Sequence, residues 1–130
     1  GELLAALAAR QPLFAATGGC HGALLAEAHA GGAVLGFGED VGRHNALDKA
    51  IGEAARRGAD LAHCIAVLSG RAGYDLVVKC LRVRVPVIVS VSAPSALAFD
   101  LCHAAGATLL GFARGERHQV YCGAERFPDG

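Results

Sequence analysis

Residues 39–49, with the sequence Glu-Asp-Val-Gly-Arg-His-Asn-Ala-Leu-Asp-Lys, carry the densest group of chemically active side chains in this protein. They place seven ionisable or amide side chains in eleven positions of a chain that is 53% hydrophobic. We expect a strand-to-helix junction here, where charged side chains and free helix N-terminal amides can hold an anionic ligand. The alternative is a solvated first helical turn, since such turns are commonly polar. The candidates are Glu39, Asp40, Gly42, Arg43, His44, Asn45, Asp48 and Lys49.

Two further polar turns follow apolar runs of the sequence. Ser69-Gly70-Arg71 comes after one run, and Ser92-Ala93-Pro94-Ser95 comes after the next. Ligands of open α/β sheets collect outside the carboxyl ends of parallel strands. Backbone N–H groups of these turns, with a guanidinium from Arg43 or Arg71, would suit an anionic, nucleotide-sized ligand. Ordinary helix capping by Ser and Gly is the alternative.

His44 and Asp48 stand one helical turn apart in this first run. A carboxylate at that spacing can orient an imidazole beside a ligand, or the two can be boundary residues paired for structure. Both interpretations remain open from the sequence. The spacing of the other histidines does not suggest a metal site.

The chain has five cysteines, an odd number, and none of them forms a CxxC motif. A disulfide framework and a CxxC zinc or redox site are therefore not expected. Cys80 and Cys102 fall on predicted apolar helix stripes, where a thiol packs as a small hydrophobic group. Cys20, between Gly19 and His21, is a weak candidate for a reactive thiol, because a neighbouring imidazole can lower a thiol pKa.

Length and charge bound the class of protein. A chain of 130 residues is long enough for one domain with a real core. The formal net charge is zero, so we expect no nucleic-acid partner. No apolar run approaches the roughly 20 residues of a membrane span, and we expect a cytoplasmic protein with no membrane partner. Because the sequence contains no Met, we expect residues 1–130 to be a single domain cut from a longer protein.

Hydrophobic periodicity predicts the element order α-β-β-α-β-α-β-α-β-β. This order predicts a three-layer α/β/α domain with a mixed sheet, in which an antiparallel hairpin precedes parallel βαβ units. The predicted helices are 2–10, 43–57, 75–83 and one that Pro94 and Ser95 open and Gly106 ends; the predicted strands are 21–29, 33–38, 64–68, 87–91, 107–112 and 118–122.

Taken together, the motifs resemble those of the FdhD family, the formate dehydrogenase accessory sulfurtransferases. The resemblance spans nearly the whole chain. It implies a cytidine-deaminase-like fold, a homodimer, and the transfer of sulfur from a cysteine desulfurase to the bis-molybdopterin guanine dinucleotide cofactor of molybdenum or tungsten, before formate dehydrogenase receives that cofactor. The matching segments are Thr17-Gly18-Gly19, His21, residues 39–49, Ser69-Gly70-Arg71, Ser92-Ala93-Pro94-Ser95 and Gly111-Phe112-Ala113-Arg114.

The same resemblance implies where the cofactor binds. It places a C-terminal segment against the guanine dinucleotide, with the polar turns and Thr17, Gly18, Gly19 and His21 lining the same pocket. GDP would then act as a mimic of the cofactor. Arginine side chains, which can donate two hydrogen bonds at once, and helix N-termini suit the pyrophosphate of the cofactor. Glu39 or Asp40 could accept hydrogen bonds from its guanine. The C-terminal segment is Phe112, Ala113, Arg114, Gly115, Glu116 and Arg117.

The sequence departs from the family pattern in two places. The family carries sulfur as a persulfide on a CxxC loop upstream of the matched region, and these 130 residues contain no CxxC. Where the family has Ser-Gly-Arg-x-Ser-x-Glu, residues 69–75 read Ser-Gly-Arg-Ala-Gly-Tyr-Asp, which lacks one hydroxyl and shortens one acid. Either the sequence begins after the reactive loop, or the chain binds cofactor without transferring sulfur.

Two other classes of protein are alternatives to the sulfurtransferase. A cofactor-binding chaperone module without covalent chemistry would differ from the sulfurtransferase by lacking a reactive Cys pair. A zinc nucleoside deaminase would share the implied fold, but its His-x-Glu and Pro-Cys-x-x-Cys ligands are missing from this sequence.

Overall fold

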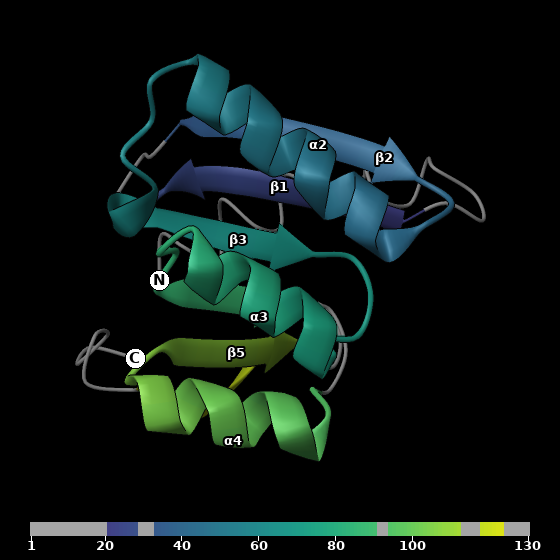
Figure 1. The fold of residues 1–130 in the computed structure, drawn as a ribbon. Helices are drawn as coiled ribbons and strands as arrows, with labels where there is room; N and C mark the ends of the chain where they lie inside the picture. The colour runs from purple at the N-terminus through teal and green to yellow at the C-terminus, as the bar shows by residue number, and fades with distance from the viewer. Residues whose placement is uncertain (1–20, 29–32, 91–93, 113–117, 124–130) are drawn as a thin grey trace.

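The computed structural model describes residues 21–28, 33–90, 94–112 and 118–123. Within them a six-stranded sheet has the strand order β2-β1-β3-β4-β5-β6 (Figure 1). The strands are β1 His21–Glu27, β2 Val34–Asp40, β3 Cys64–Leu68, β4 Val87–Ser90, β5 Thr108–Phe112 and β6 His118–Cys122. The helices are α2 Arg43–Arg56, the short 3-10 helix Leu61–His63, α3 Tyr74–Arg82 and α4 Ala96–Ala105.

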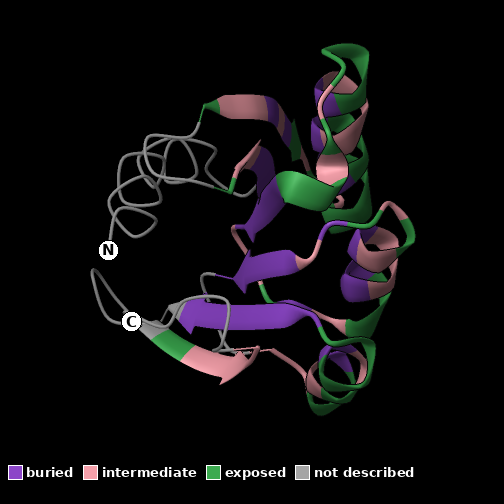
Figure 2. Ribbon diagram, turned by 90° about the vertical axis from the view of Figure 1, so that its left-hand side faces the viewer, coloured by how far each residue is buried: buried purple, intermediate pink, exposed green. Residues whose placement is uncertain are grey.

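The strand directions confirm the predicted mixed α/β architecture. β1 pairs antiparallel with both β2 and β3, the pairs β3–β4 and β4–β5 are parallel, and β6 is antiparallel to β5. The helices α2, α3 and α4 all cover one face of the sheet (Figure 2). The helix predicted at residues 2–10, and with it the second helical layer, lies outside the described residues.

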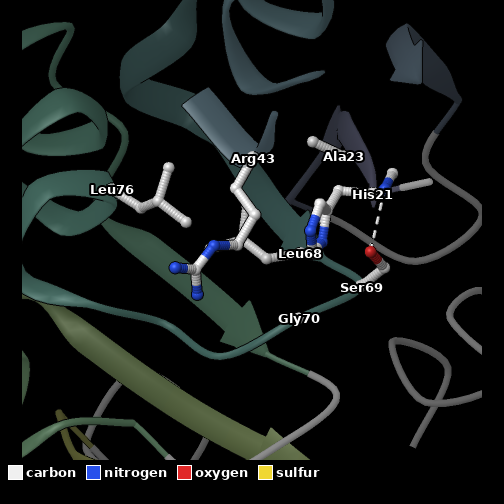
Figure 3. Close-up of a pocket in the computed structure, with 8 residues that line it drawn as sticks. His21, Ala23, Arg43, Leu68, Ser69, Gly70 and Leu76 are labelled. Carbon is white, nitrogen blue, oxygen red and sulfur yellow. Dashed lines mark hydrogen bonds between the residues drawn. The ribbon is translucent and has the colours of Figure 1, made fainter. Parts of the chain in front are cut away.

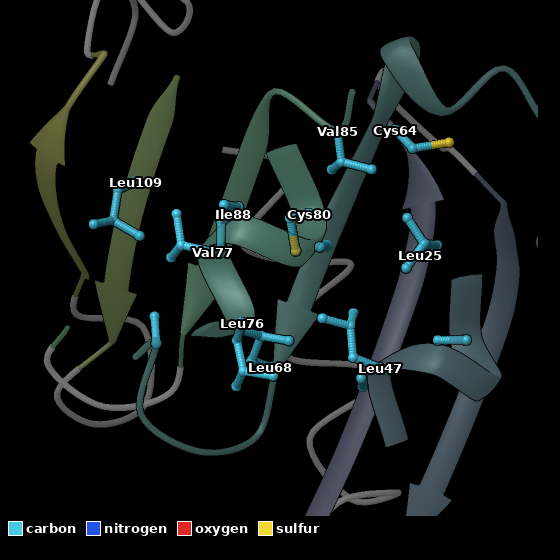
Figure 4. Close-up of a cluster of buried hydrophobic side chains, with 14 of the residues drawn as sticks. Leu25, Leu47, Cys64, Leu68, Leu76, Val77, Cys80, Val85, Ile88 and Leu109 are labelled. Carbon is cyan, nitrogen blue, oxygen red and sulfur yellow. The ribbon is translucent and has the colours of Figure 1, made fainter. Parts of the chain in front are cut away.

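Buried strands occupy the centre of the sheet. Every residue of β3 and β4 is buried, as expected for apolar runs covered on both faces. On the helical side the core gathers residues from the sheet and from all three helices (Figure 4). On the opposite face a second buried cluster forms from Leu24, Ile65, Val67, Val87, Val89 and Leu110.

Helix α4 shows how local residues set an element's limits. Its N-cap is Ser95, whose Oγ accepts a hydrogen bond from the backbone N–H of Ala98 at 3.1 Å. It ends at Gly106, which adopts the left-handed φ of 71° that favours glycine at this position. Helical spacing places Leu97 on the same apolar stripe as Ala98 and Cys102 and so predicts that it is buried. This prediction is wrong, because the Leu97 side chain is 64% exposed. It lies in the first turn of α4, where Ala98 instead faces the core.

Helix α2 lies unusually close to β2. Its buried residues are mainly alanines, including Ala46 and Ala50, and they lie over Gly36 and Gly38 of β2. A Cβ atom at either glycine would overlap a backbone carbonyl oxygen of the helix. Small residues on both elements therefore permit direct backbone packing, which fixes where α2 begins relative to the end of β2. The helical period also places Ala55 on the apolar stripe of this helix beside Ala54, but Ala55 is exposed whereas Ala54 is buried.

In the part of the chain that the structure describes, no helix has both the length and the apolar character needed to cross a membrane.

Candidate functional site

The strands β3, β4 and β5 end at one edge of the sheet, and α2, α3 and α4 begin at that same edge (Figure 1). Strand β1 runs in the opposite direction, so its first residue also lies there. His21 is paired in register with Asp40 at the end of β2, and Ala23 with Leu68 at the end of β3. The topology therefore gathers residues from distant parts of the sequence at the edge where α/β proteins bind ligands.

A small pocket opens at this edge (Figure 3). Three of the sequence motifs contribute to it: His21, Arg43 and the Ser69-Gly70 turn. Its volume is about 10 Å³, which is room for a single water molecule. The pocket thus accepts one small group, such as a phosphate oxygen, and a nucleotide would have to lie across its mouth. The complete lining is His21, Gly22, Ala23, Arg43, Leu68, Ser69, Gly70 and Leu76.

Arg43 is the cationic group of the pocket. It is the first residue of α2, and within the described residues its guanidinium has neither a hydrogen-bond acceptor nor an ion-pair partner. Gly70 lies beside it: a Cβ added there would be 3.6 Å from Arg43 Cδ and 3.5 Å from His21 Nδ1. The guanidinium is therefore available for an anion, with an imidazole close by.

Hydrogen bonds hold the Ser69-Gly70 turn in place. Ser69 Oγ accepts a hydrogen bond from Gly22 N–H at 2.8 Å, and Ser69 N–H donates to the carbonyl oxygen of Gly22 at 3.0 Å. The hydroxyl of Ser90 donates to the carbonyl oxygen of Gly70 at 2.8 Å. Ser90 is not among the site residues predicted from the sequence. The signal for it is a hydroxyl residue within the apolar run of residues 87–91, and the structure shows that Ser90 is the fully buried last residue of β4.

Asp40 forms a second polar cluster, at the start of α2. Its Oδ1 accepts from Gly42 N–H at 3.0 Å and from Asn45 Nδ2 at 3.4 Å, and its Oδ2 accepts from Lys49 Nζ at 2.9 Å. The backbone amide of Gly42 is the main cause that lowers the pKa of Asp40 to about 2, followed by Lys49. Asp40 is therefore a carboxylate at neutral pH, and each of its oxygens accepts at least one hydrogen bond from this chain.

The proposed pairing of His44 with Asp48 is wrong. Asp48 instead binds Lys79 of α3, with its two oxygens 2.9 and 3.1 Å from Nζ. Among the described residues, the carboxylate that pairs with His44 is that of Asp75, 4.0 Å from its Nε2, and both side chains are exposed. Helix spacing allowed the first pairing, but Lys79 provides a charged partner from a neighbouring helix that spacing within one helix does not reveal.

The remaining candidates have different positions. Glu39 is exposed and adjoins Asp40 on β2, so it faces the side of the sheet opposite to α2. Arg71 is exposed in the turn after the pocket residues, and Ser95 is engaged as a helix cap. Pro94 is partly buried next to it. Phe112 ends β5. Outside the described residues lie Thr17, Gly18, Gly19, Cys20, Ser92, Ala93, Ala113, Arg114, Gly115, Glu116 and Arg117.

Three of the described cysteines are buried thiols whose pKa is raised, which disfavours the reactive thiolate. Cys80 and Cys102 are fully buried, as predicted from the helix stripes. Burial raises the pKa of each of these two thiols to about 12, and it also raises the pKa of Cys64. Cys122 is partly buried, forms no disulfide with another described cysteine, and its Sγ donates to the carbonyl oxygen of Ala107 at 3.5 Å. Among the described residues, no three His, Cys, Asp or Glu side chains come together as a candidate metal site.

The fold and the pocket define a mixed α/β domain with a cationic site at the carboxyl edge of its parallel strands. The chain belongs to the FdhD/NarQ family, whose model matches residues 1–128. This membership confirms the resemblance drawn from the motifs.

Relatives of known name support the same assignment. The chain is 51% identical over 127 residues to the sulfur carrier protein FdhD of Anaeromyxobacter sp. (strain K), a match that covers 92% of this chain and 43% of that protein. It is 48% identical over 123 residues to the sulfur carrier protein FdhD of Xanthomonas euvesicatoria pv. vesicatoria (strain 85-10), covering 95% and 43% respectively. The chain therefore spans less than half the length of these curated relatives.

A solved structure has a similar fold. It is the crystal structure of a chain assigned as a formate dehydrogenase accessory protein from Desulfotalea psychrophila, with a TM-score of 0.72 and 36% sequence identity. The match covers 84% of this chain and 48% of that one. This likeness supports the α/β fold and the family; the cytidine-deaminase-like label stays a prediction.

Proposed function

We propose that this domain binds the guanine dinucleotide form of the molybdenum or tungsten cofactor, as part of a sulfur carrier that supports formate dehydrogenase maturation. The observation that carries the proposal is the position of Arg43. Arg43, whose guanidinium has no partner within the described residues, lines a pocket at the sheet edge together with His21. The names of two relatives, both sulfur carrier proteins FdhD, support the sulfur-carrier part of the proposal.

The chemistry of the pocket suits a pyrophosphate. Arg43 would form a bidentate pair with phosphate oxygens, and the first amides of α2 would add the positive end of the helix dipole. The pocket's volume of about 10 Å³ limits the buried portion to one oxygen. The rest of the ligand would extend across the rim, where Arg71 is exposed.

The partners follow from this role. We propose that a cysteine desulfurase donates the sulfur and that formate dehydrogenase receives the sulfurated cofactor. A homodimer, and contacts of residues 112–117 with the guanine dinucleotide, belong to the same proposal.

A second candidate function is cofactor binding without sulfur transfer. The thiols favour it for the described part of the chain, because burial raises the pKa of Cys64, Cys80 and Cys102 and leaves little thiolate to attack a persulfide. Incubation with a cysteine desulfurase and cysteine separates the two functions. A carrier gains the mass of a sulfur atom on a thiol, whereas a binding module keeps its mass.

Calorimetric titration with GDP and, in parallel, ADP tests the binding proposal. We expect selective GDP binding that Arg43→Ala and Arg71→Ala weaken. Arg82→Ala is the matched control. Arg82 is an exposed arginine in the last turn of α3, and the pocket lies at the other end of this helix, where α3 begins. Equal affinities of the wild type and Arg43→Ala would contradict the placement of the ligand at this pocket.

A further inference from the structure

We infer that Asp40 is a positioning residue that locks the start of α2 so that Arg43 reaches the pocket, and that it does not read the guanine base. The inference rests on the proposed function for its ligand. Its structural basis is the set of contacts that Asp40 makes within this chain.

Asp40 connects the end of β2 to the first two turns of α2. Oδ1 receives the N–H of Gly42, the residue just before the helix, and the amide of Asn45 in its first turn. Oδ2 receives Lys49 Nζ from the second turn, and Nζ also donates to the carbonyl oxygen of Glu39 at 3.0 Å. One carboxylate and one ammonium group thus tie the last two residues of the strand to the helix.

This clamp has a specific task because α2 lacks a conventional N-cap. Gly42 occupies the N-cap position and has no side chain to accept a hydrogen bond from the first turn. Asp40, two residues earlier, instead fixes the orientation of the Gly42 peptide group. Arg43 follows directly, so the direction in which its side chain leaves the backbone depends on that peptide group.

The same contacts argue against base reading by Asp40. A carboxylate that recognises guanine must accept hydrogen bonds from two guanine donors at once. Oδ1 of Asp40 already accepts two hydrogen bonds and Oδ2 accepts one, and the side chain is only 21% exposed. A carboxylate has about four acceptor positions in all, so the one that remains, on Oδ2, is fewer than guanine requires. A guanine that bonds to both oxygens would have to displace the Gly42 amide or Asn45 from Oδ1, and either exchange would loosen the start of α2.

The test compares Asp40→Asn, Lys49→Met and Asp48→Asn by calorimetry with GDP and with xanthosine diphosphate. Asp48→Asn is the matched control, because it weakens another exposed Asp–Lys contact of α2, that with Lys79. Loss of the clamp should weaken the binding of both nucleotides about fivefold, which is the effect of one net hydrogen bond. We expect this decrease in affinity in Asp40→Asn and in Lys49→Met, and no further decrease in the variant that combines these two substitutions. Asp48→Asn should bind both nucleotides as the wild type does.

Two results would overturn the inference. If Asp40 read the base, Asp40→Asn would shift preference from GDP to xanthosine diphosphate, because an amide complements the xanthine edge, and Lys49→Met would leave affinity unchanged. A purely structural role would lower the melting temperature in all three variants without changing affinity in any of them.

Amide hydrogen exchange of residues 42–46 separates this inference from the proposed function. If the wild type binds neither nucleotide, the proposed function fails. Amide exchange then still tests whether Asp40 and Lys49 hold the start of α2. Faster exchange in Asp40→Asn and Lys49→Met than in Asp48→Asn supports the clamp. Equal exchange in all three variants overturns it.

Discussion

Gly38 of β2 lies directly beneath the carbonyl oxygen of Ala46 in α2, with no space between them for a methyl group. The helix that presents Arg43 is therefore positioned by backbone contact with the hairpin, in addition to the side chains of the core. A substitution at Gly38 should therefore shift the start of α2 and Arg43 with it, even though Gly38 does not line the pocket.

Gly38→Ala should destabilise the domain by about 1–3 kcal/mol, because overpacking forces the backbone of α2 away from β2. Gly52→Ala is the control within α2, where the new Cβ meets only the flexible end of Arg56 at 3.3 Å. That variant should gain up to about 1 kcal/mol from helix propensity. Urea unfolding measures both changes, and equal stability of the two variants would contradict the close packing.

Ser69→Ala should cost about 1–3 kcal/mol of unfolding free energy, because it leaves the buried N–H of Gly22 without its acceptor. It should also weaken GDP binding, since Ser69 lines the pocket. Ser95→Ala removes a helix cap and should cost about 1 kcal/mol without changing affinity. Retention of full GDP affinity by Ser69→Ala would show that the turn does not shape the site.

Acid should release Asp40 from its clamp over a defined pH range. The pKa of Asp40 is lowered in the folded chain from 3.8 to about 2. A lowered pKa stabilises the fold above the unfolded value, and this contribution is lost as the pH falls from about 4 toward 2. NMR measures this release, because the chemical shift of the Gly42 amide should change with a midpoint near pH 2. In Asp40→Asn the transition should vanish, and the stability of that variant should fall less steeply in the same range.

Thiol-specific labelling at neutral pH should spare Cys80 and Cys102 in the folded protein. Both are fully buried, and burial raises the pKa of each thiol to about 12, so very little thiolate is available to react. Peptide mass spectrometry after labelling, with and without denaturant, measures each site. The same experiment tests Cys20: alkylation no faster than that of free cysteine would end its candidacy as a sulfur carrier.

Periodicity was sufficient to predict most of the fold. The alanine-rich stripe after Arg43 and the apolar runs that became β3 and β4 each have a clear period or a fully apolar composition, and the structure confirms these elements. Leu97 shows the limit of this method, because an apolar residue in a first helical turn can face solvent. Whether a residue in the first turn of a helix is exposed depends on how far the neighbouring strands and helices extend beside it. The spacing of residues within one helix does not give that information.

The candidate site was only partly predictable. The motifs identified His21, Arg43 and the Ser69-Gly70 turn, and strand order brings them into one pocket. The partners of individual charges were harder to predict, since Asp48 binds Lys79, 31 positions away. Such pairs depend on which helices lie side by side, and a single sequence does not provide that information.

The reciprocal hydrogen bonds between Gly22 and Ser69 join residues 47 positions apart in the chain. A contact of such long sequence separation requires the intervening chain to be closed into a loop, at a cost in conformational entropy. The pocket consequently exists only in the finished fold, and a ligand that occupies it should bind the native state without binding the unfolded one. Occupancy would then raise the free energy of unfolding by mass action. A domain holding its cargo should open less often to proteases than an empty one, so cofactor supply would also influence how long this protein survives in the cell.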